Sequence, residues 1–176
     1  MGRLWPWLRG AEAGVAGRRA ESSTSTSRST SASTLAHVVP ISPGAALQAY
    51  VDASTRSSRV TGLGVVIRDA QQQLIGWHAR TARGMTNNEG EYEAMIFALE
   101  VLIPVAPATL TVYSDSRIMI DQMNGAARVH SPGLRVQHRR ATALLKRLPR
   151  VVLAYVPREW NVLADAMAED AVLRGT

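Results

Sequence analysis

The chain contains no cysteine, so disulfide bonds and thiolate-bound metal sites are excluded. It also lacks long hydrophobic runs, because no apolar stretch approaches the roughly 18 residues that a membrane-spanning helix needs. We therefore expect no membrane partner. The length of 176 residues is sufficient for one domain that buries its own hydrophobic core.

Acidic residues are outnumbered, but only modestly. The formal net charge is +6, and arginine supplies 19 of the 20 basic residues. A basic surface favours polyanions such as nucleic acid, although many proteins that bind none carry a similar excess. Residues 1–36 hold five arginines and two glutamates, which leaves 15 basic and 12 acidic residues, or +3, for the rest. Charge alone therefore says little about the partner.

The first 40 residues differ in composition from the rest, and we predict that residues 1–40 are a disordered extension rich in Ser, Thr and Arg. From Ser22 to Thr34, 11 of 13 residues are Ser or Thr, which cannot build a core and predict disorder. The Arg-rich stretch before them resembles a transit peptide, which would indicate a mitochondrion or plastid. Glu12, Glu21 and the helix-interrupting Pro6 argue against a transit peptide. The alternatives are an unstructured extension of a cytoplasmic bacterial protein, or a start codon assigned too early.

Residues 45–176 have the pattern of a folded α/β domain. Hydrophobic periodicity and turn residues predict the order βββαβααβα, which implies a five-stranded mixed sheet flanked by helices. The stretch between the first two strands is polar and predicts a loop, 55–61. Predicted strands are 47–54, 62–69, 74–81, 109–115 and 150–156; predicted helices are 88–102, 116–125, 134–148 and 162–173, the last capped by Asn161.

Two aspartates stand at the ends of predicted strands. Asp52 closes the first strand, where aspartate is a poor strand former, and Asp115 follows the fourth strand directly. In an open mixed sheet, ligand sites collect at the ends of central strands. Either aspartate alone could equally be a turn or capping residue.

Two further carboxylates lie on helical faces that we expect to be buried. Glu91, in TNNEGEYEAMIFALE, lies on the apolar stripe of its helix, whereas Glu89 and Glu93 can turn toward water. Asp165 lies on the apolar stripe of the last helix. Either carboxylate could instead be half-buried beside an arginine. The two stripes are Ala94, Met95, Ala98 and Leu102, and Val162, Ala168 and Val172.

Taken together, the four carboxylates favour a metal ion. Like charges held close in a partly dry site repel one another and shift toward protonation, and a divalent cation reverses that balance. Mg²⁺ prefers oxygen ligands and leaves positions open for water and phosphate. Without cysteine or clustered histidine, Mg²⁺ or Mn²⁺ fits better than zinc. We interpret Asp52, Glu91, Asp115 and Asp165 as metal ligands.

These residues, in this order, resemble the ribonuclease H family, type 1, in its reverse-transcriptase-like branch. The matching pieces are YVDAS, GLGVVIRD, TNNEGEYEAMIFALE, YSDSRIMIDQMNG and PREWNVLADAMAEDA, spanning about residues 46–172. The family's five-stranded mixed sheet flanked by helices agrees with the elements predicted above. The resemblance implies that the four carboxylates are the family's catalytic metal ligands.

The resemblance also implies a reaction, the endonucleolytic cleavage of the RNA strand of an RNA–DNA hybrid to leave 5′ phosphates. Two Mg²⁺ ions about 4 Å apart would bridge the scissile phosphate, with Mn²⁺ as a substitute. Asn87 and Asn88 match the family's asparagine pair that reads the minor groove, where carboxamides contact base edges and the RNA 2′-hydroxyl. Asn88 alone could also be a helix cap.

Three features depart from the family pattern. The Gly-Asn-Pro-Gly loop after the first aspartate is absent, although Arg56 and Arg59 could meet phosphate there. The loop before the last helix, YVPREWN, lacks the histidine that many relatives carry there, so we expect catalysis without histidine and slower turnover. The basic handle of some relatives is replaced by a plain helix, whose Arg135, Arg139 and Lys146 either contact the DNA strand or form a solvated face.

Two other functions stay open at this point. One is a non-catalytic nucleic-acid-binding module on the same fold, although such a module gains nothing from negative charge concentrated beside phosphate. The other is a different nuclease of this fold, acting on branched DNA or on single strands.

Overall fold

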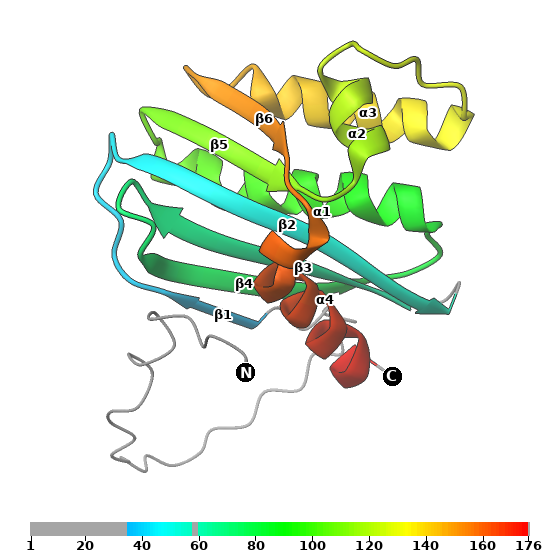
Figure 1. Ribbon diagram of the computed structural model, residues 1–176, viewed down its shortest axis with the longest axis horizontal. Helices are drawn as coiled ribbons and strands as arrows, with labels where there is room; N and C mark the ends of the chain where they lie inside the picture. The colour runs from blue at the N-terminus through cyan, green and yellow to red at the C-terminus, as the bar shows by residue number, and fades with distance from the viewer. Residues whose placement is uncertain (1–34, 58–59, 176) are drawn as a thin grey trace, which may run out of the picture. The chain divides into compact units, whose positions relative to one another are not determined.

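The computed structural model describes residues 35–57 and 60–175, and these contain one mixed sheet (Figure 1). Its six strands lie in the order β1-β4-β3-β2-β5-β6. Strands β1 to β4 pair antiparallel, whereas β5 and β6 run parallel to β2. The strands are β1 (Leu35–Val38), β2 (Ala46–Ser57), β3 (Val60–Asp69), β4 (Leu74–Ala82), β5 (Thr109–Ser114) and β6 (Val151–Tyr155).

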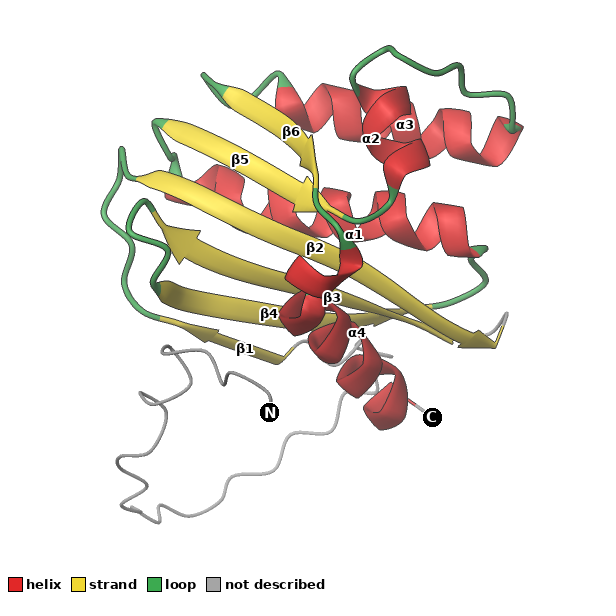
Figure 2. Ribbon diagram, in the orientation of Figure 1, coloured by secondary structure: helices red, strands yellow, loops and turns green. Residues whose placement is uncertain are grey.

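Helices cover both faces of this sheet (Figure 2). Helices α1 and α3 lie on one face and α4 lies on the other. None of the described helices is long and apolar enough to cross a membrane. The helices are α1 (Asn87–Leu102), α2 (Arg117–Met123), α3 (Pro132–Leu145) and α4 (Val162–Gly175), with short 3-10 turns η2 (Ile103–Val105) and η3 (Arg158–Trp160). The predicted α/β architecture is confirmed, with one strand more than expected.

The additional strand is β1, which pairs antiparallel with β4 and forms one edge of the sheet. It lies inside the segment that we predicted to be disordered, so that prediction is wrong for Leu35–Val38. Four residues are too short a run to show a period, and only pairing with β4 reveals the strand. Residues 1–34 of the predicted extension lie outside the described residues.

The predicted loop 55–61 is also wrong for its described residues, because β2 extends to Ser57 and β3 begins at Val60. Thr55 pairs with Thr61, and the register shifts between Thr55 and Ser57. β-branched side chains fit a paired strand even where the sequence is polar. Arg59 lies outside the described residues, while Arg56 is exposed and forms an ion pair with Glu169 at 3.4 Å.

The main core lies between the sheet and α1. Alternate residues of β2 and β3 point into it, and α1 buries Met95, Ile96 and Leu99 against them. α2 contributes Met119 and Ile120 to the same core. The strand residues are Leu47, Ala49, Val51, Leu63, Val65 and Ile67.

On the opposite face, α4 lies very close to β3. A β-carbon at Gly62 would collide with the backbone of Ala168, and one at Gly64 with the backbone of Ala164. The missing side chains therefore allow this approach. Since Gly64 pairs with Asp52 in the sheet, the approach brings α4 directly beside that aspartate.

The buried face of α4 differs from the predicted stripe at its first member. Val162 is 51% exposed, and the helix buries Ala164, Ala168, Ala171 and Val172 instead. Ala164 and Ala168 lie where the backbone of α4 approaches the glycines of β3, and this close approach favours small side chains there. Asp165 lies at the edge of this face, half-buried.

Candidate active site

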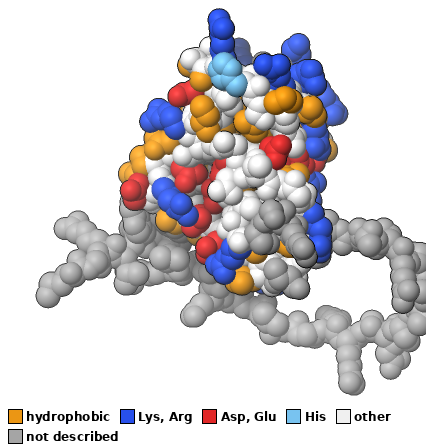
Figure 3. Space-filling model, turned by 90° about the vertical axis from the view of Figure 1, so that its right-hand side faces the viewer, with side chains coloured by type: hydrophobic (Ala, Val, Ile, Leu, Met, Phe, Trp, Pro, Cys, Tyr) orange, Lys and Arg blue, Asp and Glu red, His pale blue; other side chains and the backbone are white. Residues whose placement is uncertain are grey.

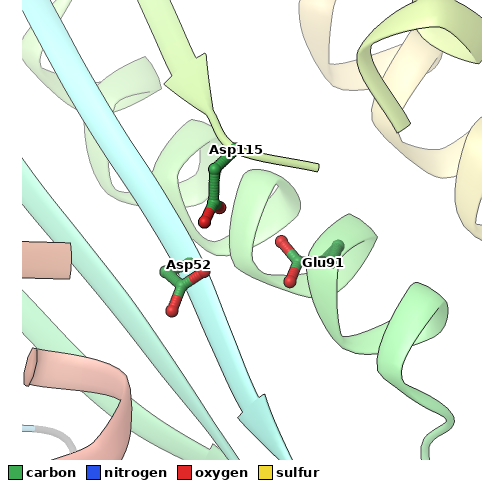
Figure 4. A group of neighbouring side chains, drawn as sticks. All are labelled: Asp52, Glu91 and Asp115. Carbon is green, nitrogen blue, oxygen red and sulfur yellow. The ribbon is translucent and has the colours of Figure 1, made fainter. Parts of the chain in front are cut away.

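Asp52 and Asp115 come together because both lie just beyond the paired stretch of two neighbouring parallel strands. Asp52 is inside β2, which continues to Ser57, so the prediction that it ends its strand is wrong. β2 and β5 pair as far as Tyr50 and Tyr113, and each aspartate lies two residues beyond its paired tyrosine. Glu91 reaches the same place from α1 (Figure 4). One carboxylate oxygen from each of the three residues lies within 4.8 Å of the others. We call Asp52, Glu91 and Asp115 the acidic triad.

The start of α1 places Glu91. Thr86 and Glu89 form a capping box, in which the Thr86 N–H donates to Glu89 Oε2 at 2.9 Å. The prediction that Asn88 caps this helix is therefore wrong. Gly90 lets the first turn lie against the β2–β3 hairpin, because a β-carbon there would come within 3.1 Å of the Ala53 side chain.

The triad is electrostatically strained without a cation. Burial, and then the charges of Glu91 and Asp115, raise the pKa of Asp52 to about 9. Burial, and then the charge of Asp115, raise the pKa of Glu91 to about 8. The Oε2 atom of Glu91 is buried and has no hydrogen-bond partner among the described residues. An all-carboxylate set with an unsatisfied buried oxygen fits a hard divalent ion such as Mg²⁺ or Mn²⁺.

Asp165, the fourth predicted ligand, lies beside Asp52 rather than within the triad. Its charge and a side-chain hydrogen bond both contribute to the raised pKa of Asp52. Arg158 donates from Nη2 to Asp165 Oδ1 at 3.0 Å, and its side chain is 73% exposed. Sequence reasoning missed Arg158, although it stands in the PREWN segment that we matched to the family.

All six predicted site residues line one cavity of about 360 Å³. Asn87 and Asn88 are exposed at the start of α1, where they face the same opening as the carboxylates. On the face shown in Figure 3, acidic side chains gather in one area and basic side chains lie around it. The four histidines, all among the described residues, are not part of the lining. Its members are Asp52, Ala53, Ser54, Thr55, Asn87, Asn88, Glu91, Asp115, Ser116, Arg158 and Asp165.

Glu93, by contrast, does not turn toward water as predicted. It is 6% exposed and accepts hydrogen bonds from Arg140 at 2.9 Å and from Arg80 at 3.2 Å. The prediction failed because α3 packs over α1 and carries Arg140 to it. The predicted basic stripe of α3 (Arg135, Arg139 and Lys146) is exposed.

Comparison with known proteins agrees with this geometry. The model of the family described as reverse transcriptase-like matches residues 50–171. Ribonuclease HI of Halobacterium salinarum is 30% identical over 136 residues, which are 77% of this chain and 68% of that protein. The chain belongs to the ribonuclease H family. The crystal structure of RNase H1 from that archaeon superposes with a TM-score of 0.70, covering 74% of this chain and 98% of the other.

Two further ribonuclease H relatives extend the comparison. LC11-RNase H1, solved in complex with an RNA/DNA hybrid, is 29% identical with a TM-score of 0.69, covering 73% of this chain and 98% of that one. The "Bifunctional protein Rv2228c" of Mycobacterium tuberculosis is 31% identical over 112 residues, which are 63% of this chain. The match covers 31% of the mycobacterial protein, so this chain spans about a third of that relative's length.

Proposed function

We propose that this ribonuclease H is an endonuclease that hydrolyses the RNA strand of RNA–DNA hybrids with bound Mg²⁺, leaving 5′ phosphates. The convergence of the acidic triad in a cavity that also presents Asn87 and Asn88 carries the proposal. The hybrid bound to LC11-RNase H1, a relative of similar sequence and fold, supports the substrate class.

The triad would hold one ion, and Asp165 together with Asp52 would hold a second. When bound, such ions polarise the scissile phosphate and make an attacking water more acidic. The protein's part is to present ionised oxygens at a fixed place. A bound cation would offset the burial and the repulsion that now raise the pKa values of Asp52 and Glu91, so both would be ionised at neutral pH.

Other residues would position the nucleic acid. The amides of Asn87 and Asn88 can donate to and accept from base edges and the 2′-hydroxyl, the group that distinguishes RNA from DNA. The guanidinium of Arg158 is exposed, so it can donate to a phosphate oxygen with its solvent-facing N–H groups while it keeps its contact with Asp165. On α3, Arg135, Arg139 and Lys146 would meet phosphates of the DNA strand.

The test is cleavage of labelled RNA–DNA hybrid, duplex DNA and duplex RNA with Mg²⁺, comparing wild type with Asp115→Asn. We expect cleavage of the hybrid alone, 5′-phosphate ends, and no cleavage by the variant. Binding of hybrid without cleavage in Mg²⁺ or Mn²⁺ would instead identify a non-catalytic binding module. Cleavage of DNA in preference to the hybrid would identify a different nuclease of this fold.

For localisation we propose the cytoplasm of a bacterium, or a mitochondrion or plastid if residues 1–40 include a transit peptide. Because Leu35–Val38 pairs with β4, a cleaved leader should end before Leu35. N-terminal sequencing of the mature protein checks this. A mature chain beginning after Val38 would contradict the role of β1 in the folded domain.

A further inference from the structure

Asn161 immediately precedes α4 and is 1% exposed. At this position an asparagine usually caps the helix by accepting from a backbone N–H with its side-chain oxygen. Here that oxygen, Oδ1, has no hydrogen-bond partner among the described residues. The side-chain capping role that we predicted for Asn161 is therefore wrong.

The side chain of Asn161 turns into the sheet instead. Its Nδ2 donates to the carbonyl oxygen of Val51 at 2.9 Å and to Asp115 Oδ1 at 3.1 Å. Both partners are acceptors, so only the NH₂ end of the amide can face them. The orientation of the amide therefore follows from the chemistry of its neighbours.

This amide bridges β2 and the residue after β5 just where their pairing ends. The last paired residues are Tyr50 and Tyr113, and Val51 is the residue before Asp52. The backbone of Asn161 adds a third attachment, because its carbonyl oxygen accepts from the N–H of Asp165 at 3.1 Å. One buried residue is thus bonded to Asp115, to the neighbour of Asp52 and to Asp165.

We propose that Asn161 is a positioning residue of the metal site. It holds β2 at Val51 and one oxygen of Asp115 at the separation that lets Asp52 and Asp115 share an ion. The second oxygen of Asp115 is left for that ion. This inference rests on the proposed function, because it assigns Asn161 to the same metal site.

The matched experiment replaces two asparagines that make the same kind of bond. Asn124 donates from Nδ2 to the carbonyl oxygen of Leu153 at 3.1 Å, and it lies outside the cavity that holds the triad. Asn161→Ala, Asn161→Asp, Asn124→Ala and Asn124→Asp would be prepared as the full chain. Binding of Mn²⁺ and Mg²⁺ would be titrated by calorimetry without nucleic acid, and kcat and KM measured on hybrid.

We expect both Asn161 variants to bind metal about 10- to 100-fold more weakly than wild type and to lose kcat by a similar factor. KM for the hybrid should stay unchanged, because Asn161 is buried and does not line the cavity, so it cannot contact the hybrid. Asn161→Asp should be the more severe variant, since it sets a carboxylate against Asp115. Both Asn124 variants should match wild type in metal affinity and kcat.

A purely structural role gives a different result. In that case Asn161→Ala lowers the melting temperature equally with and without Mg²⁺ and keeps the wild-type metal affinity, which would overturn the proposal. If Asn161→Asp fails to fold, Asn161→Ala decides alone by the same two measurements. Wild-type protein that binds no metal would also overturn it. Metal binding that weakens in Asn161→Ala without any cleavage of hybrid by wild type would support the positioning role and reject the proposed function.

Discussion

Helix α1 carries two enclosed glutamates, two residues apart, whose surroundings are opposite. Glu93 lies between Arg80 and Arg140, which also pair with Glu100, so the protein supplies its compensating charge. Glu91 faces Asp52 and Asp115 and has a buried oxygen with no partner among the described residues. A buried carboxylate that is paired with arginines of the same chain has a structural role. A buried carboxylate surrounded by other carboxylates requires a bound cation.

Activity should separate the two glutamates most strongly. We predict that Glu91→Gln lowers kcat on hybrid by more than about 100-fold, beyond the loss typical of residues that only support metal ligands. Glu93→Gln should stay within a few-fold of wild type, because its partners lie away from the cavity. Steady-state kinetics with Mg²⁺ on labelled hybrid measures both. Equal losses in the two variants would show that the distinction between these glutamates is wrong.

The effects on stability should be opposite for the two glutamates: the Glu93 variant should lose stability and the Glu91 variant should gain it. Glu93→Gln removes the charge that two arginines share, and we expect a loss of about 1–3 kcal/mol in the free energy of unfolding. Glu91→Gln removes repulsion, so the metal-free protein should melt about 2–4 °C higher, the shift that about 1 kcal/mol gives in a domain of this size. Calorimetric unfolding in EDTA checks both. A destabilising Glu91→Gln would contradict the strain assigned to the triad.

The dependence of stability on pH sharpens the same contrast. Asp52 and Glu91 have pKa values of about 9 and about 8 in the folded protein, above their ordinary values of 3.8 and 4.5. The folded state therefore retains protons that the unfolded state releases, and the linked stability is present at low pH and is lost as pH rises toward about 9. In EDTA, the stability advantage of Asp52→Asn over wild type should grow between about pH 5 and about pH 9.

Melting temperatures across that pH range, with Glu93→Gln as the control, test this expectation. Excess Mg²⁺ should remove the growing difference, because the metal replaces the retained protons. If the difference between Asp52→Asn and wild type does not change with pH in EDTA, the triad is not the group that holds these protons.

Arg158 should give the smallest effect. Its contact with Asp165 is largely exposed, so we expect Arg158→Ala to raise KM for hybrid by roughly 2- to 5-fold, within the range of exposed ion pairs. Arg174, which pairs with Asp170 at 2.8 Å on the same helix, provides the matched control. Arg174→Ala should leave KM unchanged. If both variants raised KM equally, the effect would come from the overall positive charge attracting the hybrid, and not from a direct contact of Arg158 with the hybrid at the cavity.

The sequence was sufficient for the features that depend on local pattern. The strand end before Asp115 and the position of Glu91 on an apolar stripe follow from periods of two and of 3.6 residues. The difference between Glu91 and Glu93 cannot be predicted from these periods, because it depends on Arg80 from β4 and Arg140 from α3. Such partners are set by tertiary packing.

The start of α4 shows the same limit. Asn161 has the sequence of a helix cap, and only the sheet edge beside it reveals that its amide bonds to Val51 and Asp115. Val162 fits a helical stripe, yet it is exposed, and Ala164 and Ala168 lie against the glycines of β3. Strand β1 is defined by its pairing with β4, which no local pattern contains.

The most direct test of the cation requirement is to locate a bound ion. Crystals of wild type and of Glu91→Gln would be grown with Mn²⁺ and their anomalous scattering measured. We expect a peak among Asp52, Glu91 and Asp115 in wild type, at about 2.0–2.3 Å from their oxygens, and a weaker peak or none in the variant. Saturating Mn²⁺ with no peak at the three carboxylates would contradict the claim that their proximity depends on a metal.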